Sequence, residues 1–314
     1  MNKFAFDLFR LLRPRQWIKN VAVFAAAMFA GQLFEPSVFE KVLMSFVVFC
    51  ALSSATYVIN DIFDVKKDRL HPFKKFRPLA HGDIPLSVGV VIAIVLLILS
   101  LFGALLVTPA FLTVCVVYLI IQFLYSTKLK AIAVADILAI AAGYILRVYA
   151  GEFASGFHIS VWLLLTTISI SLFLAVGKRR SELTLLTNNR KTDIAETRKS
   201  LSHYSERLLD VYASIFATST FIAYSLFTFL ETPTGFRINF NLFMPDFLPA
   251  FFQRKWLMIT IVPVVYGLMR YLQDIYEKNE GESPEKVLLS DRPLLTTVII
   301  WILLVVFIIY AVGP

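Results

Sequence analysis

The chain has 314 residues, of which 58% are hydrophobic, and its mean hydropathy is +0.73. A soluble domain does not need that much apolar surface, and charges scattered through the first twenty residues argue against a secretory signal peptide. Lys and Arg outnumber Asp and Glu by 30 to 22. In a membrane protein the placement of bases matters more than their sum, so no nucleic-acid partner is expected. Cys50 and Cys115 lack redox or metal-ligand spacing.

The hydrophobic residues fall into runs that predict an all-α, polytopic membrane bundle in a single domain spanning residues 1–314. Residues 1–16 mix Phe and Leu with bases and predict an interfacial helix. Most of the following runs approach the ~20 residues that cross a bilayer. About nine transmembrane helices are therefore expected, at 17–34, 38–59, 86–107, 110–125, 132–150, 159–177, 208–230, 256–272 and 294–312.

The basic residues predict the orientation of these helices. With the N-terminus inside, 25 of the 30 Lys and Arg residues fall in the inner segments. The positive-inside rule then places the N-terminus in the cytoplasm and, with an odd number of helices, the C-terminus in the periplasm. We expect a multi-pass protein of the bacterial inner membrane whose active-site loops, 60–85 and 178–207, face the cytoplasm.

Two long inner loops follow the second and the sixth run. This layout predicts two four-helix halves with the ninth helix left over, an arrangement common in membrane proteins. The outer loop 231–254 carries six Phe residues, and we expect it to lie on the outer leaflet as an amphipathic segment.

The stretch Asn60–Asp68 carries the strongest chemical signal. Asp61, Asp64 and Asp68 stand at i, i+3 and i+7, which on a helix places them within roughly 60° of one face. Three like charges on one face repel unless a cation lies among them, and Mg²⁺ suits an all-oxygen set that it shares with substrate phosphates. The alternative is a solvated segment whose acids pair with nearby bases. The position at the end of an apolar run favours the metal.

Basic residues near this stretch are candidates to bind phosphate. Lys74, Lys75 and Arg77 follow the acids directly. Tyr125 and Lys130 lie at the inner end of the fourth run, where they act either as an interfacial anchor or as phosphate ligands.

The fifth run contains Asp136 and Arg147, and a charge within a membrane helix marks either function or a buried partner. About 16 Å along the helix axis separates the two, so they cannot pair directly. A structural role and a substrate role for Arg147 are therefore left equally open.

The sixth run ends in Gly177-Lys178-Arg179-Arg180-Ser181-Glu182. These bases either satisfy the positive-inside rule alone or bind phosphate. Together with the acidic stretch, they suit a diphosphate substrate and a second anion, because Arg and Lys clamps are the usual partners of phosphate groups.

These residues carry a family resemblance that covers nearly the whole chain. Asn60-Asp61-x-x-Asp64-x-x-x-Asp68 resembles the first acidic motif of the UbiA-type membrane prenyltransferase superfamily. The resemblance implies a bundle of about nine helices that binds a diphosphate through Mg²⁺ at this motif, in a cavity open to lipid.

A narrower similarity points to the decaprenyl-phosphate phosphoribosyltransferase branch. It rests on Arg13 to Asn20, which includes Lys19, on Asp68-Arg69-x-His71-Pro72, on Leu146-Arg147-x-x-Ala150-Gly151, on Gly177-Lys178-Arg179, on Arg198 to Leu201 and on Gly281-Glu282-x-Pro284-Glu285. It implies transfer of 5-phosphoribose from phosphoribosyl pyrophosphate to a polyprenyl phosphate, with release of pyrophosphate, to supply arabinose donors for the cell envelope.

One departure from the superfamily decides between two activities. Aromatic prenyltransferases carry a second acidic motif after the sixth span, where this chain has Gly177 to Glu182. A basic segment suits a phosphorylated acceptor, whereas prenyl transfer to an aromatic acceptor remains the alternative. The resemblance implies metal ligation by Asp61, Asp64 and Asp68. It implies substrate binding by Asn60, Lys19, Lys74, Lys75, Arg77, Tyr125, Lys130, Arg147, Lys178 and Arg179. The oligomeric state, homo-oligomer included, stays open.

Overall fold

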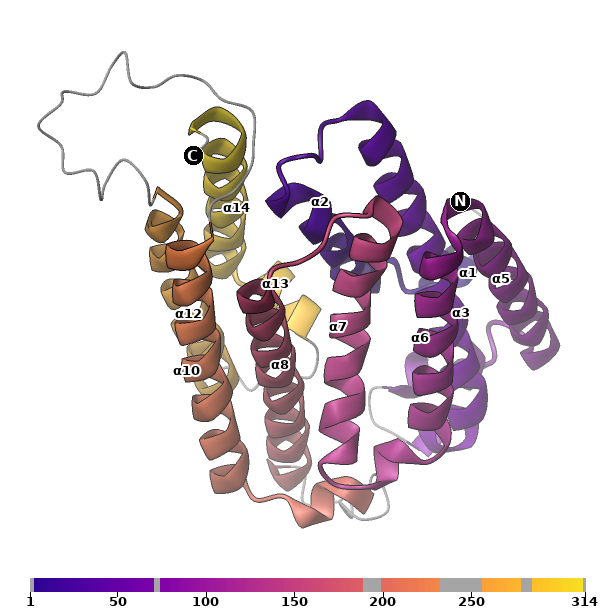
Figure 1. The fold of residues 1–314 in the computed structure, drawn as a ribbon. Helices are drawn as coiled ribbons and strands as arrows, with labels where there is room; N and C mark the ends of the chain where they lie inside the picture. The colour runs from indigo at the N-terminus through magenta and orange to yellow at the C-terminus, as the bar shows by residue number, and fades with distance from the viewer. Residues whose placement is uncertain (1–2, 71–73, 189–198, 232–255, 278–283, 313–314) are drawn as a thin grey trace, which may run out of the picture. The chain divides into compact units, whose positions relative to one another are not determined.

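The computed structural model describes residues 3–70, 74–188, 199–231, 256–277 and 284–312 (Figure 1). Every regular element in these ranges is helical. The chain divides into two compact units, which are described separately below. Unit 1 comprises residues 1–24 and 40–156, and unit 2 comprises residues 25–39 and 157–314.

Eight helices of the described ranges are long and apolar enough to cross a membrane, which confirms an all-helical, multi-pass protein. Unit 1 holds α3 (Pro36–Leu70), α5 (Leu86–Val107), α6 (Pro109–Thr127) and α7 (Ala135–Ser155). Unit 2 holds α8 (Val161–Asn188), α10 (Glu206–Leu230), α12 (Ile261–Glu277) and α14 (Arg292–Phe307).

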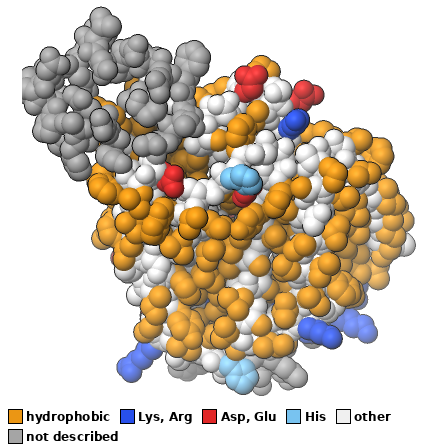
Figure 2. Space-filling model, in the orientation of Figure 1, with side chains coloured by type: hydrophobic (Ala, Val, Ile, Leu, Met, Phe, Trp, Pro, Cys, Tyr) orange, Lys and Arg blue, Asp and Glu red, His pale blue; other side chains and the backbone are white. Residues whose placement is uncertain are grey.

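The surface agrees with a lipid environment. Only 17% of the most apolar window of α5 is buried inside the protein. Hydrophobic side chains cover most of the face shown in Figure 2, and few charges interrupt them. Apolar side chains that are this exposed need a non-aqueous solvent, because a soluble monomer rarely shows large contiguous apolar patches.

The first expected span, 17–34, takes a different form. It folds as a 3₁₀ helix, η1 (Pro14–Phe24), followed by the short helix α2 (Ala25–Phe29). Neither helix is long enough to be one of the eight helices that could cross a membrane. Asn20 and Val23 of η1 are completely buried, whereas Val21 is 46% exposed, so one face of this run packs inside the protein. Hydropathy reports burial but does not distinguish lipid from protein as the apolar surroundings.

The N-terminal helix α1 (Lys3–Leu11) is amphipathic, as predicted for residues 1–16. Phe4, Phe6 and Phe9 expose about half of their surfaces, whereas Leu11 is buried. Leu11 belongs to a core cluster with Val58 and three residues between 79 and 93. This core holds the end of α1 and the short helix α4 (Pro78–His81) against α3. It therefore fixes what surrounds the last turns of α3.

Unit 2 has its own core, in which α8 packs along α10. The Tyr224 hydroxyl lies 2.6 Å from Oγ1 of Thr260, in η6 (Trp256–Thr260), and accepts a hydrogen bond from Nε1 of Trp301 at 2.8 Å. Arg270 of α12 donates to Asp291 at 2.7 Å, and Asp291 caps the N-terminus of α14. The remaining elements are η4 (Lys199–His203), α13 (Pro284–Ser290) and η7 (Ile308–Val312).

The predicted division into halves changes in two respects. The ninth run, expected to be left over, is α14 of unit 2. The fifth apolar run, now α7, belongs to unit 1, because it packs against α6 and η1. Each unit then contains four of the eight helices, and the acidic and basic segments each end the first long helix of their unit. The loop at 231–254 lies outside the described residues, apart from Glu231.

Candidate active site at the acidic end of α3

The acidic stretch lies on α3 itself, which continues as a helix to Leu70. This confirms the helical spacing on which the expected common face depended. Asp61 and Asp68 are 2% and 5% exposed, whereas the side chain of Asp64 exposes 19% of its surface. Two of the three carboxylates are therefore removed from solvent and require partners.

Arg77 bridges the two buried carboxylates. Its Nη1 atom lies 3.0 Å from Oδ1 of Asp61 and 2.6 Å from Oδ2 of Asp68. Arg77 precedes α4, and the packing of Leu79 in the core of unit 1 holds that helix in place. Asp61 and Asp68 therefore face the same point, and that point carries positive charge.

Arg13 supplies a second cation to Asp61. Its Nη2 atom lies 2.5 Å from Oδ1 of Asp61, and its guanidinium lies 5.4 Å from the ring centre of Tyr57. Burial opposes the charge, but the Asp61 carboxylate raises the pKa of Arg13 above its usual value, so the guanidinium stays charged. The backbone φ of Arg13 is +53°, which is uncommon for a residue other than glycine and is found where surroundings impose it.

Lys130 is the partner of Asp64. Its Nζ atom lies 2.7 and 3.0 Å from the two carboxylate oxygens. Lys130 lies in η3 (Leu129–Ala131), between α6 and α7. Val134, between η3 and α7, has a φ of +67°, an outlier for a β-branched residue. Of the three cationic partners, Arg13 itself has a positive φ, whereas the outlier near Lys130 is Val134.

The donor set fits a hard divalent cation in its chemistry. Three carboxylates and the Asn60 amide oxygen on consecutive turns form the all-oxygen set that Mg²⁺ prefers. Within the described ranges, three or more acid, His or Cys side chains are nowhere gathered as closely as a metal requires. The carboxylates instead meet bases, which was the alternative left open. A cation held by both Asp61 and Asp68 would therefore have to compete with Nη1 of Arg77.

Several other predicted site residues lie near this end of α3. Asn60 accepts a hydrogen bond from Oγ of Ser126 at 3.2 Å, next to the partly buried Tyr125. Lys74 and Lys75 lie in η2 (Lys74–Phe76), where Lys75 is exposed and Lys74 partly buried. Lys19 donates to Oε1 of Gln16 at 2.6 Å, two turns of η1 from Arg13. His71 and Pro72 lie outside the described residues.

Arg147 lies inside unit 1, where it is 3% exposed. Its Nε donates to Oδ1 of Asn20 at 2.7 Å, its Nη2 to the Tyr118 hydroxyl at 3.2 Å, and its Nη1 to the carbonyl oxygen of Gly143. All three nitrogens thus bind protein groups. Of the two roles left open for Arg147, this geometry favours the structural one.

The predicted bases of unit 2 differ from one another in their surroundings. Arg179 is completely buried and forms an ion pair with Glu182 one turn later. Arg180 lies 2.8 Å from Asp210 and 5.4 Å from the ring centre of Tyr276, so it joins α8 to α10 and α12. Lys178 is partly exposed. Lys178 and Arg180 are thus both partly exposed, and among the three bases only Arg179 is removed from solvent. Arg198 and Gly281 to Ser283, which contributed to the resemblance, lie outside the described residues.

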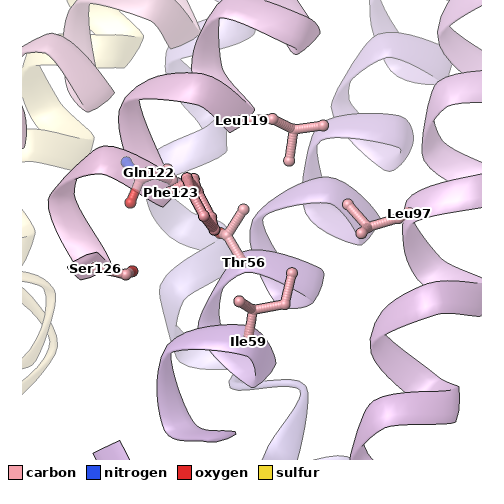
Figure 3. Close-up of a pocket in the computed structure, with 7 residues that line it drawn as sticks. All are labelled: Thr56, Ile59, Leu97, Leu119, Gln122, Phe123 and Ser126. Atoms are coloured by element: carbon pink, nitrogen blue, oxygen red, sulfur yellow. The ribbon is translucent and has the colours of Figure 1, made fainter. Parts of the chain in front are cut away.

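A crevice of about 170 Å³ lies between α3, α5 and α6, and Figure 3 shows its lining side chains. Ser126, the hydrogen-bond partner of Asn60, marks its polar end. The crevice is smaller than the ~300–1,000 Å³ of typical ligand sites, and most of its lining is apolar. It therefore does not suit a phosphorylated sugar. The lining residues are Thr56, Ile59, Leu97, Leu119, Gln122, Phe123 and Ser126.

Sequence reasoning missed Arg13 as a member of this site. Arg13 belongs to the quoted Arg13–Asn20 motif, yet a base before a membrane segment is expected from the positive-inside rule alone. Its contact with Asp61 spans 48 residues of sequence. The positive φ of Arg13, which precedes Pro14, cannot be predicted from residue types.

The fold and the site define the class of this protein. It is a multi-pass helical membrane protein in which carboxylates and bases gather at the end of one helix. A model described as the UbiA prenyltransferase family matches residues 20–290. The chain therefore belongs to the UbiA prenyltransferase family and is a membrane-embedded transferase.

The chain is also similar to individual proteins in sequence and in fold. The chain is 35% identical over 297 residues to the decaprenyl-phosphate phosphoribosyltransferase of Mycobacterium tuberculosis, covering 93% of this chain and 91% of that protein. It is 37% identical over 299 residues to the protein of the same name from Mycolicibacterium smegmatis, covering 94% and 90%. A UbiA homologue from Archaeoglobus fulgidus bound to GPP and Mg²⁺ shares the fold, with a TM-score of 0.70 at 19% identity, over 96% of this chain and 99% of that one.

Proposed function

We propose that this protein transfers 5-phosphoribose from phosphoribosyl pyrophosphate to a polyprenyl phosphate, such as decaprenyl phosphate, and releases pyrophosphate. The observation that carries the proposal is the acidic end of α3, where three carboxylates meet cations from three separate elements. Such a site suits a donor that brings both a metal-binding pyrophosphate and a separate 5-phosphate. Relatives at 35–37% identity bear the name of this activity.

Asp61, Asp64 and Asp68, with Asn60 assisting, would hold Mg²⁺ on the pyrophosphate of the donor. When bound, the ion supplies a Lewis acid that stabilises negative charge on the departing pyrophosphate. Arg77 and Lys130 already lie against these carboxylates, so the donor's phosphates can take over their positive charges. Lys74 and Lys75 extend the same basic segment toward the 5-phosphate.

Lys178 is proposed to bind the phosphate of the lipid acceptor. The attacking oxygen is already anionic, so the reaction needs no strong general base. The oxygen of the lipid phosphate forms a bond to C1 of the ribose while the bond from C1 to the pyrophosphate oxygen breaks. The side chains contribute mainly by positioning both substrates and by stabilising charge. Arg179 is proposed to support the end of α8 through its ion pair with Glu182.

The cellular part of the proposal rests on the family resemblance and on the distribution of bases along the chain. We propose that the protein lies in the bacterial inner membrane with its active site facing the cytoplasm, where the soluble donor is available. The product would supply arabinose donors for cell-envelope glycans.

The proposal is tested by mixing purified protein, polyprenyl phosphate, Mg²⁺ and labelled phosphoribosyl pyrophosphate. The expected result is a labelled lipid and an equal amount of pyrophosphate. A parallel reaction offers a polyprenyl diphosphate and an aromatic acceptor. If only the parallel reaction proceeds, the proposal is wrong and the protein is an aromatic prenyltransferase.

A further inference from the structure

Arg147 carries a charge in the interior of a membrane protein, and its hydrogen-bond partners among the described residues are neutral. Its guanidinium donates to Asn20, Tyr118 and Gly143. It also lies 5.2 to 5.9 Å from the ring centres of three aromatic residues, Phe49, Tyr118 and Tyr144. A buried charge is costly in a membrane helix, so a neutral residue would suffice if packing were its only task. The directed donors of the guanidinium require another explanation.

The side chain of Asn20, in η1, makes hydrogen bonds with three other side chains. Its Oδ1 accepts from Arg147, and its Nδ2 lies 3.1 Å from Oγ of Ser53 and 3.2 Å from Sγ of Cys50. Ser53 and Cys50 belong to α3, whereas Arg147 belongs to α7. Asn20 therefore joins η1 to both helices, and Arg147 supplies the link to α7.

A continuous series of contacts runs from this point to the acidic end of α3. The ring of Tyr144 lies 5.9 Å from the Arg147 guanidinium and 5.6 Å from Nζ of Lys19. Lys19 donates to Oε1 of Gln16, which lies 3.4 Å from the Tyr57 hydroxyl. The Tyr57 ring in turn contacts Arg13, the partner of Asp61.

We propose that Arg147 is a positioning residue, which holds η1 so that Arg13 and Lys19 stay aligned with the acidic end of α3. The inference rests on the proposed function where it concerns transfer, and on geometry alone where it concerns η1. Arginine suits the task because its planar fork donates in three directions at once, whereas lysine offers a point charge on a flexible stem.

The first test measures amide hydrogen exchange of the full-length protein in lipid nanodiscs, without substrate. Arg147→Lys removes the link between Asn20 and α7, whereas Asn20→Ala removes that link and also the bonds to Ser53 and Cys50. Each should speed exchange across residues 14–24 by about tenfold, because a buried donor or acceptor loses its partner, while α10 stays unchanged. The control Arg15→Gln changes an exposed base of the same segment and should leave exchange unaltered.

The second test is a double-mutant cycle on phosphoribosyl transfer. Arg147→Lys should lower kcat/KM by at least about tenfold in the wild-type background, but by less than about threefold when Asn20 is already Ala. A direct phosphate ligand would cost the same factor in both backgrounds, and that outcome would overturn the proposal. Should Arg147→Lys fail to fold, Arg147→Gln replaces it in both tests.

The two tests separate this inference from the proposed function. If wild-type protein transfers no phosphoribose, the proposed function fails, yet the exchange test still decides whether Arg147 anchors η1. If exchange across residues 14–24 is unchanged in both variants, the positioning role is refuted, whatever the enzyme does.

Discussion

Nη1 of Arg77 lies 2.6 Å from Oδ2 of Asp68, and the same atom lies 3.0 Å from Oδ1 of Asp61. One guanidinium nitrogen therefore contacts two buried carboxylates that lie two helical turns apart, and Arg13 supplies the second positive charge at Asp61. Arg77 and Arg13 together balance the charges of Asp61 and Asp68. This arrangement also places Arg77 in competition with any divalent cation that binds between the two carboxylates.

Arg77→Gln tests this competition. In EDTA, the variant should lose about 1–3 kcal/mol of unfolding free energy, because the carboxylates then lose a shared donor. Mg²⁺ should restore more stability to the variant than to the wild type, since a ligand that binds only the folded state stabilises it. Thermal unfolding in detergent, with EDTA or Mg²⁺, provides the measurement. If Mg²⁺ stabilised both proteins equally, Arg77 and the cation would not compete for the same position between Asp61 and Asp68.

Asp64→Asn should lower phosphoribosyl transfer by at least about 100-fold, because the amide neither carries charge nor binds Mg²⁺ as strongly. Folding should persist, since the Asp64 side chain is 19% exposed. Asp83→Asn is a matched control outside the site, where Asp83 pairs with Lys3 at 3.3 Å. Initial rates and unfolding curves of both variants provide the comparison. A fully active Asp64→Asn protein would show that transfer does not need Asp64 as a metal ligand.

Removal of divalent metal should abolish transfer reversibly. EDTA should stop release of pyrophosphate, and Mg²⁺ in excess should restore it, because an all-oxygen site binds hard divalent cations weakly enough to exchange. Activity plotted against free Mg²⁺ gives the measurement. Undiminished transfer in EDTA would rule out a metal-dependent reaction.

Lys178 and Arg179 should respond differently to substitution, although they are neighbours. Lys178→Ala should raise KM for the lipid phosphate without changing stability, because Lys178 is partly exposed. Arg179→Gln should cost about 3 kcal/mol of unfolding free energy, because it leaves the Glu182 carboxylate without its buried partner. Kinetics and thermal unfolding separate the two effects. A stable, inactive Arg179→Gln protein would assign substrate binding to Arg179.

Gly151→Ala should weaken the packing of η1 against α7. A Cβ atom at this position would lie 1.9 Å from the carbonyl oxygen of Val23, a backbone atom that cannot simply rotate away. The expected loss is about 1–3 kcal/mol of unfolding free energy. Gly267→Ala is the matched control, because its nearest contact would be 4.0 Å away. Chemical or thermal unfolding of the two variants tests the difference.

The sequence predicted the features that depend on periodicity. Long apolar runs predicted the membrane helices, since hydropathy over ~20 residues reflects the thickness of the bilayer. The i, i+3, i+7 spacing of Asp61, Asp64 and Asp68 predicted a common helical face because α-helix geometry is fixed. Both follow from local rules, which need no knowledge of distant residues.

What the sequence by itself determined is a multi-pass helical protein with an acidic helix end and bases close by. Only the tertiary structure decided which base meets which acid, that the first apolar run folds as the 3₁₀ helix η1 and the short helix α2, and that Arg147 binds Asn20, 127 residues earlier. The physical reason is that hydrogen bonds and ion pairs depend on directions and distances of a few ångströms. Packing of distant segments sets these, and residue types along the chain do not encode them locally.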